Sequence, residues 1–304
     1  MIIPPYLQPG DTIGLVCPAG FMPAEKVESA IQTLQQWGFK VVTGRTVGGN
    51  SDTYFSGTDA ERLLDLQAMI DDENIRAVLC ARGGYGTGRI IDLLDFKNFL
   101  RHPKWIIGFS DITVLHSHLY SNYKIASLHA PMAAAFNDGE SKNEYIQSLY
   151  HALIGNKADY TCESHAFNTQ GMAEGRLIGG NLSLLAHLIG TPSDLKTKKK
   201  ILFVEDIGEY IYNIDRMMYQ LKRSGKLEKI SGLIVGRFSD TKDTDRPFGQ
   251  TAEEVIRDAV KEYDYPVCFN FPVSHEKQNY ALKIGVKYTL NVAGDVSLKE
   301  SMEE

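Results

Sequence analysis

The chain has 304 residues, of which 43% are hydrophobic and 23% are charged, and its formal net charge is −6 at pH 7. This length favours two domains over one, and the composition is typical of a globular protein that folds on its own. The negative charge gives no reason to attract nucleic acid or an anionic membrane surface, and no apolar stretch approaches the roughly 20 residues that span a bilayer.

The N-terminal segment and the cysteines both indicate a cytoplasmic protein. Residues 1–11 have neither a basic segment nor a long apolar run. The cysteines are widely spaced and form no C-x-x-C pair, which favours reduced thiols over a zinc or redox motif. They are Cys17, Cys80, Cys162 and Cys268.

The first part of the chain alternates short apolar runs with longer amphipathic stretches, which is typical of a parallel sheet with crossover helices. Thr58 and Glu61 form a capping-box pattern that predicts the start of a helix. The predicted strands are 12–17, 40–43, 75–80, 105–109 and 126–128, and the predicted helices are 24–37, 59–70, 88–94 and 111–120. We therefore expect an α/β domain over residues 1–136.

The second part of the chain has a different texture. Residues 137–170 are polar and mixed, with a helical stretch near 143–153, and we expect them to form a connection. From residue 171 to 304, glycine turns and short apolar runs indicate a beta-rich domain, although its charged segment 299–304 is expected to fray. The predicted strands are 201–204, 232–235, 267–269 and 288–292, and the predicted helices are 182–188, 213–224 and 251–263.

Ser110 stands between a predicted strand and a predicted helix. Ligands of open α/β sheets bind at the carboxyl ends of strands, and this abrupt change suits a nucleophile elbow, where the N–H of the next residue, Asp111, can face an oxyanion. The G-x-S-x-G pattern is incomplete, because Ile112 stands in place of its second glycine. Local sequence equally permits Ser110 to be a simple helix N-cap.

A glycine-rich loop, Arg82 to Gly88, follows the predicted strand 75–80 and has four glycines in seven residues. It is not a dinucleotide fingerprint, because Arg89 occupies the position of the last glycine, and it lacks the G-K-[ST] ending of a phosphate P-loop. Glycines let backbone N–H groups approach a ligand closely. The loop is therefore either an oxyanion donor or a tight turn.

A nucleophilic serine needs a base and an orienting acid. His129 and His275 both follow predicted strands, and the sequence pattern alone does not separate them. Glu205 directly follows an apolar strand, where a carboxylate can hold an imidazole, while Asp206 is expected to point to the opposite face. A solvated strand end is the alternative interpretation of these acids.

Together these segments resemble the LD-carboxypeptidase family of serine peptidases, which includes muramoyl-tetrapeptide carboxypeptidases and microcin C self-immunity peptidases. The resemblance implies that Ser110 is the nucleophile, Glu205 the acid and His275 the base, with oxyanion donation from the backbone N–H groups of Asp111 and Gly84. It runs nearly end to end, through residues 7–14, 81–86, 108–113, 179–182, 203–209, 214–216 and 272–275.

The same resemblance implies a doubly wound parallel α/β N-terminal domain and a beta-rich, barrel-like C-terminal domain, with the triad completed at their interface, in a homodimer. The implied activity is release of terminal D-alanine from murein tetrapeptides in peptidoglycan recycling, with no metal or organic cofactor.

Two other functions remain open at this stage. A microcin-C-type peptidase cleaves an aminoacyl-nucleotide amide and stacks the base on an aromatic side chain, but Trp37 and Trp105 fall in core-like segments here. A non-catalytic sugar- or nucleotide-binding module would use the glycine-rich loop alone.

Overall fold

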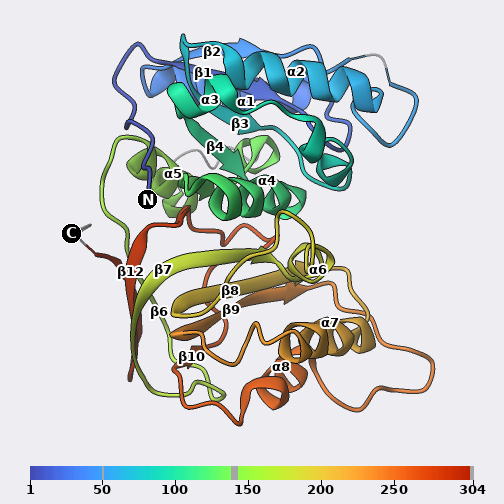
Figure 1. Ribbon diagram of the computed structural model, residues 1–304, viewed down its shortest axis with the longest axis vertical. Coiled ribbons are helices and arrows are strands. Elements are labelled where there is room, and N and C mark those ends of the chain that lie inside the picture. The colour runs from blue at the N-terminus through green and yellow to red at the C-terminus, as the bar shows by residue number, and fades with distance from the viewer. Residues whose placement is uncertain (50, 138–142, 302–304) are drawn as a thin grey trace. The chain divides into compact units, whose positions relative to one another are not determined.

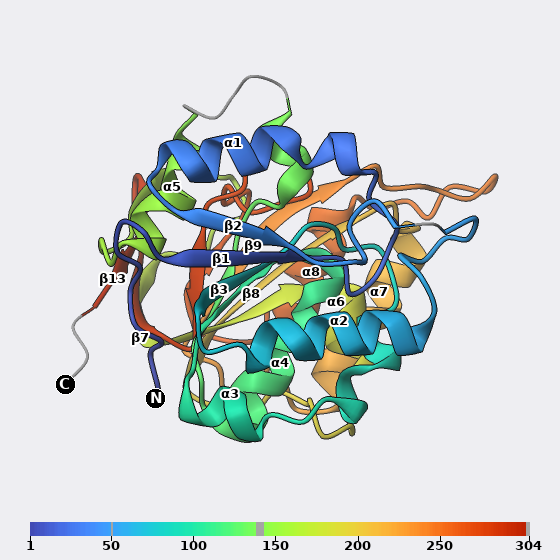
Figure 2. The same cartoon turned by 90° about the horizontal axis from the view of Figure 1, so that it is seen from above.

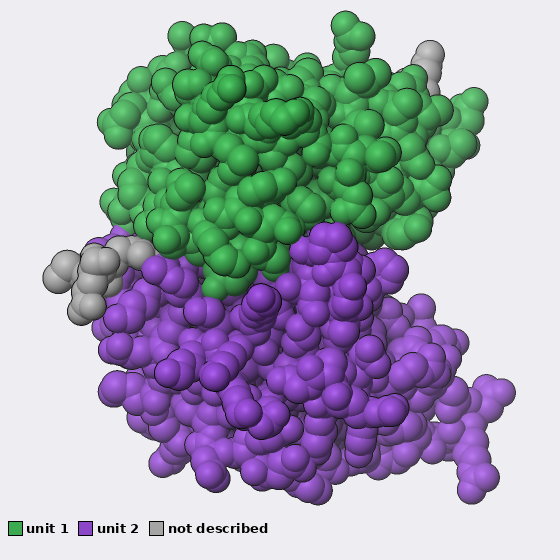
Figure 3. Space-filling view, in the orientation of Figure 1, with its two compact units in different colours: residues 1–156, 280–283 green, residues 157–279, 284–304 purple. Residues whose placement is uncertain are grey.

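The computed structural model describes residues 1–49, 51–137 and 143–301 and divides into two compact units, which Figure 3 colours separately. The first unit comprises residues 1–156 and 280–283, and the second comprises residues 157–279 and 284–304. The boundary falls inside the segment 137–170 that we expected to be a connection. The return of residues 280–283 to the first unit was not indicated by the sequence.

A six-stranded sheet, in the order β11-β5-β4-β3-β1-β2, forms the centre of the first unit. The strands β1 to β5 are parallel to one another. The central strands are almost entirely buried, because their near-continuous apolar sequence suits a sheet covered on both faces. The strands are β1 (Thr12–Val16), β2 (Lys40–Thr43), β3 (Ile75–Cys80), β4 (Trp105–Gly108), β5 (Ser127–His129) and β11 (Leu282–Ile284).

Helices cover both faces of this sheet, with α1 and α5 on one side and α2, α3 and α4 on the other (Figure 2). The expected doubly wound arrangement is therefore confirmed. The predicted helix 88–94 is wrong, because two short 3-10 turns, 87–89 and 91–93, replace it. The helices are α1 (Glu28–Gln36), α2 (Asp59–Asp71), α3 (Lys97–Arg101), α4 (Thr113–His118) and α5 (Glu144–Leu153).

The second unit is built on a seven-stranded mixed sheet, in the order β10-β9-β8-β7-β12-β13-β6. Its β7 to β10 half is parallel, and the half from β7 through β12 and β13 to β6 is antiparallel. The strands are β6 (Asp159–Cys162), β7 (Gly171–Asn181), β8 (Lys200–Ile207), β9 (Gly232–Ser239), β10 (Val267–Cys268), β12 (Lys287–Val292) and β13 (Val296–Glu300).

Two details of this sheet bear on the predictions. Lys299 and Glu300 pair with β12, so the prediction that the charged tail frays was wrong for these two, while residues 302–304 lie outside the described part of the chain. The N–H of Thr169 donates to the carbonyl of Val267 at 3.0 Å, and the N–H of Val267 donates back at 3.1 Å. The connection after the edge strand β6 thus reaches the opposite edge strand β10. Full closure into a barrel stays a prediction.

Three helices, α6 (Leu182–His187), α7 (Ile211–Arg223) and α8 (Ala252–Val260), pack against one another in sequence beside this sheet (Figure 1). Their amphipathic sequences bury one face of each, such as Ile214, Met218 and Leu221 of α7. Within the described ranges, the structure contains no helix with the length and apolar character required to cross a bilayer.

Candidate active site

Ser110 occupies a sharp bend between β4 and α4. The chain is extended at Phe109, with φ −147° and ψ −169°, and then turns at Ser110 with φ 62° before entering a short 3-10 turn. A positive φ is uncommon and costly for a residue with a side chain, and such strain is concentrated at functional positions. The N-cap positions of this turn and of α4 are occupied by Phe109 and Ile112, so Ser110 is the N-cap of neither. The nucleophile elbow therefore describes this position better than an N-cap does.

The glycine-rich loop lies directly against this serine. A Cβ atom on Gly83 would lie 2.9 Å from the Cβ and 3.2 Å from the Oγ of Ser110, so only glycine fits there. The carbonyl of Gly83 accepts a hydrogen bond from the N–H of Gly20 at 3.0 Å. The peptide bond between Gly83 and Gly84 is trans, so its N–H is directed opposite to its carbonyl. The N–H of Gly84 therefore points away from Gly20. The sequence singled out Gly84 and missed the close approach of Gly83.

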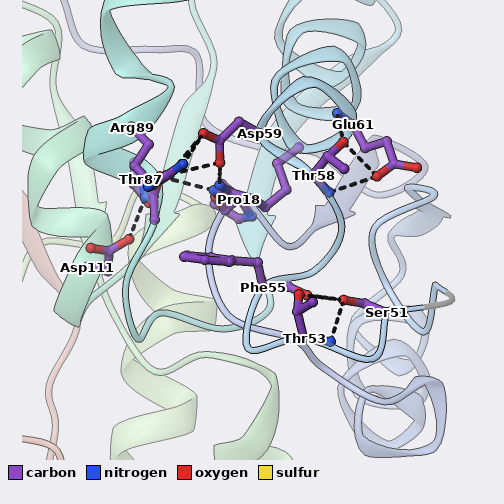
Figure 4. A network of polar contacts seen from close by, with 12 residues as sticks. Pro18, Ser51, Thr53, Phe55, Thr58, Asp59, Glu61, Thr87, Arg89 and Asp111 are labelled. Atoms are coloured by element: carbon purple, nitrogen blue, oxygen red, sulfur yellow. Dashed lines mark hydrogen bonds and ion pairs between the residues drawn. The ribbon is translucent and has the colours of Figure 1, made fainter.

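Asp111 connects the elbow to the same loop. Its buried carboxylate accepts a hydrogen bond from the N–H of Thr87 at 2.8 Å (Figure 4). Burial raises the pKa of Asp111, and the hydrogen bonds from Thr87 oppose that effect. The backbone N–H of Asp111 lies at the N-terminal start of the turn, where developing negative charge is favoured. One residue thus supports the elbow with its side chain and offers a donor from its main chain.

In the second unit, the end of β8 meets the loop that follows β10. The Nδ1 atom of His275 lies 2.6 Å from the Oε2 atom of Glu205, whose carboxylate is completely buried. A carboxylate only accepts hydrogen bonds, so Nδ1 carries the proton and Nε2 keeps its lone pair. Burial lowers the pKa of His275, but the charge and hydrogen bond of Glu205, helped by Asp206, outweigh it and leave the pKa raised. This pair can serve as a general base and its orienting acid.

The neighbouring strand β9 holds the histidine loop in place. The N–H of Arg237 donates to the carbonyl of Val273 at 3.1 Å, and its guanidinium forms an ion pair with Glu276 at 2.7 Å. A Cβ atom on Gly236 would lie 2.2 Å from the carbonyl oxygen of Val273 and 3.0 Å from the Cβ of Glu205. Glycine at 236 is therefore what allows the loop to approach the acid. Nothing in the linear sequence marked this glycine.

The carboxylate of Asp206 has its own hydrogen-bond partners and is not solvated, while its expected place on the opposite face from Glu205 stays a prediction. Asp206 is 2% exposed, and it accepts hydrogen bonds from the side chain of Asn181 at 2.7 Å and the N–H of Ser183 at 2.9 Å. Burial, reinforced by the charge of Glu205, raises the pKa of Asp206 to about 6. The alternative of a solvated strand end is thus wrong for both acids.

The histidines of the first unit near the elbow are less suited to act as the base. His129 is completely buried, and its ring lies 5.7 Å from that of Phe109. His116 is also fully buried, with both ring nitrogens 2.8 Å from their partners, and burial lowers its pKa to about 4. The side chain of His275 is 12% exposed and already faces a carboxylate. Geometry therefore favours His275 over His129, which the sequence pattern could not do.

Comparisons with known proteins match the two parts of the chain to two family domains. Residues 13–130 match the LD-carboxypeptidase N-terminal domain, and residues 174–290 match the LD-carboxypeptidase C-terminal domain. A probable murein peptide carboxypeptidase of Bacillus subtilis is 36% identical over 98% of this chain and 94% of its own length. The microcin C7 self-immunity protein of Escherichia coli is 27% identical over 93% of this chain and 91% of its own length.

A solved structure gives the same result for the fold. The muramoyltetrapeptide carboxypeptidase from Oxalobacter formigenes superposes with a TM-score of 0.86 at 28% identity, covering 96% of this chain and 99% of that one. The similarity therefore extends through both units and is not limited to the candidate site residues.

Proposed function

Because the chain belongs to the LD-carboxypeptidase family of serine peptidases, we propose that it hydrolyses the LD-peptide bond of murein tetrapeptides and releases the terminal D-alanine. The observation that carries this proposal is the hydrogen bond between Glu205 and His275. It is the second half of a serine triad, and the strained Ser110 is the first. The carboxypeptidase names of the Bacillus and Oxalobacter relatives support the substrate class.

In the proposed mechanism, Nε2 of His275 takes the proton of the Ser110 hydroxyl while Oγ attacks the carbonyl of the L-centred residue. The tetrahedral oxyanion is stabilised by the N–H groups of Asp111 and Gly84, each of which contributes about 3 to 4 kcal/mol in comparable sites. His275 then donates the proton to the departing amine of D-alanine. Water, activated by the same imidazole, attacks the acyl-enzyme and restores Ser110.

A second candidate is cleavage of an aminoacyl-nucleotide amide, as the name of the Escherichia coli relative suggests. Trp105 is buried, as expected, and cannot stack a nucleobase, whereas Trp37 is only partly buried. However, Tyr210 and Tyr212 follow β8 as a stacked pair with ring centroids 5.4 Å apart, and both are more than one-third exposed. These rings are the feature of the second unit that favours a nucleotide substrate.

The test is D-alanine release from murein tetrapeptides that carry meso-diaminopimelate or lysine at the third position, with an aminoacyl sulfamoyl adenosine as a competing substrate. We expect Ser110→Ala and His275→Ala each to reduce kcat by about 10⁶-fold, and Glu205→Ala by about 10⁴-fold. Activity that survives in Ser110→Ala would exclude the mechanism. Preferential cleavage of the nucleotide analogue would favour the second candidate.

A serine-directed phosphonate probe separates an enzyme from a binding module. We expect the wild-type chain to be labelled at Ser110 and the Ser110→Ala chain not to be labelled. A chain that is never labelled and cleaves no peptide would be a binding module. The cytoplasmic location, the role in peptidoglycan recycling and the homodimer stay predictions.

A further inference from the structure

Arg62 is an unusual residue for its position. It lies in the first turn of α2, and its side chain is 0% exposed. A cation near a helix N-terminus is opposed by the helix dipole, and removing a charge from water is costly. A hydrophobic residue of similar size would avoid both costs, so the contacts of the guanidinium should explain why a cation stands there.

Those contacts are with the loops that surround the candidate nucleophile. The Nη1 atom of Arg62 donates to the carbonyl of Pro18 at 2.5 Å and to that of Gly86 at 3.0 Å. Pro18 lies in the segment after β1, two residues before Gly20. Gly86 lies in the segment after β3, three residues after Gly83. The guanidinium therefore fastens the end of the glycine-rich loop to the neighbouring loop.

The guanidinium of Arg62 also contacts an acidic and an aromatic side chain. Its Nη2 atom forms an ion pair with Asp59, and its Cζ atom lies 4.9 Å from the centre of the Phe55 ring. Arg89 approaches the same two groups, with an ion pair of 2.7 Å to Asp59 and a distance of 5.5 Å to the ring (Figure 4). Arg89 is half exposed, and its guanidinium interacts with the carboxylate of Asp59 and with the side chain of Tyr85.

The loop between these anchors has little freedom left. Gly83 is fixed by its hydrogen bond to Gly20, Gly86 by Arg62, and Thr87 by the carboxylate of Asp111. Gly84 lies between the first two anchors. The direction of its N–H is set by the Gly83–Gly84 peptide, whose carbonyl is held by Gly20. Arg62 acts on both sides of this peptide, because it holds the Pro18 carbonyl in the segment that carries Gly20 and the Gly86 carbonyl at the end of the loop.

We propose that Arg62 is a positioning residue for the oxyanion hole, which it keeps in shape by holding the carbonyls of Pro18 and Gly86. The inference rests on the proposed function only in assuming that Ser110 is acylated. It predicts that Arg62 affects the transition state and leaves the binding of substrate and product almost unchanged.

The experiment compares Arg62→Met and Arg62→Lys with the matched control Arg89→Met. Arg62→Met removes the donors to both carbonyls at similar side-chain length, and we expect kcat to fall about 100-fold, as for the loss of one oxyanion donor, while KM changes less than about threefold. Lysine supplies one donor group in place of the planar fork, so Arg62→Lys should be intermediate. Arg89→Met loses an ion pair with the same aspartate, a contact with the same ring and the bond to the Tyr85 side chain. It keeps the donors to both backbone carbonyls, so kcat should stay within about twofold.

Further readouts distinguish positioning from general destabilisation. A peptide boronate that forms a tetrahedral adduct on Ser110 should lose affinity in parallel with kcat, whereas the product tripeptide should bind as tightly as before. Amide hydrogen exchange in residues 82–87 should accelerate more in Arg62→Met than in Arg89→Met. If Arg62→Met unfolds, the same measurements are made with Arg62→Lys.

The outcomes separate this inference from the proposed function. Equal losses in Arg62→Met and Arg89→Met, or equal weakening of boronate and product binding, would overturn the positioning role. If the wild-type chain is labelled at Ser110 but does not cleave murein peptides, the substrate proposal fails, and the labelling rates of the variants still test Arg62. A chain with no labelling and unchanged hydrogen exchange in Arg62→Met contradicts both proposals.

Discussion

The Nδ1 atom of His275 lies 2.6 Å from Oε2 of Glu205, and this contact raises the pKa of an imidazole whose burial would otherwise lower it. The base form of His275 is neutral, so activity should fall as the pH drops through this raised pKa. In Glu205→Gln the burial remains and the charge is lost, so the pKa falls. We expect the acid limb of kcat/KM to move to lower pH while kcat drops about 10⁴-fold.

A pH–rate profile checks this prediction, with Glu209→Gln as its control. Glu209 follows the same strand, and its carboxylate accepts a hydrogen bond from the side chain of Asn213 at 3.1 Å. An acid limb that stays at the same pH in Glu205→Gln would show that another group controls it.

The buried carboxylate of Asp206 should make stability depend on pH. Burial first, and then the charge of Glu205, raise its pKa from 3.8 to about 6 in the folded chain. The folded state thus binds more protons than the unfolded state between these values, so this contribution to stability is complete below pH 3.8 and is lost as the pH rises to about 6. Its size is about 3 kcal/mol, from about 1.4 kcal/mol per pKa unit.

The measurement is denaturant unfolding of wild type and Asp206→Asn at several pH values. The variant lacks the titrating group. As the pH rises from 3.8 to about 6, its free energy of unfolding should therefore decline less than that of the wild type. Parallel curves for the two chains would mean that Asp206 does not titrate in this range.

Gly236→Ala should disturb the acid–base pair without touching a reacting atom. Its Cβ would lie 2.2 Å from the carbonyl oxygen of Val273, so the histidine loop or Glu205 must move. We expect a loss of about 1 to 3 kcal/mol in stability and of about 100-fold in activity, because small displacements of catalytic groups are costly. Gly294→Ala is the control, since no atom lies within 4 Å of its Cβ position. Equal activity of the two variants would contradict the role of Gly236.

The strain at Ser110 can be measured directly by comparing two inactive variants. Its φ of 62° suits glycine and not alanine. Relief of this strain should make Ser110→Gly more stable than Ser110→Ala by about 1 kcal/mol. The greater entropy of glycine in the unfolded chain reduces this difference. Thermal unfolding of both variants supplies the comparison. A Ser110→Ala chain that is the more stable of the two would argue against a strained elbow.

The sequence was most informative where buried strands end. Both Ser110 and Glu205 follow short apolar runs, so a place near the carboxyl end of a buried strand could be predicted for each from local pattern. Glu205 was expected just after its strand, but it lies within β8, which continues to Ile207. The helix of the capping box, α2, was also predicted to within one residue, because Thr58 and Glu61 satisfy the first backbone donors locally. Each of these features is determined by residues that are close to it in the sequence.

Features that depend on distant pairing were missed. The strand β7 contains four glycines, which suggest turns, and it is held as a strand by β8 and β12 on its two sides. Lys299 and Glu300 look like a solvated tail, but they pair with β12. Gly236 acquires its importance only because the loop of His275 crosses it. No local pattern contains that information.

The return of residues 280–283 to the first unit has a consequence for how the chain folds during synthesis. The strand β11 forms an edge of the first sheet beside β5, although more than a hundred residues separate the two in the chain. A ribosome that has released only the first 156 residues has therefore supplied a sheet with one strand missing. The sheet of the first unit can be completed only after nearly all of the second unit has emerged, so the first unit cannot finish folding ahead of the synthesis of the second.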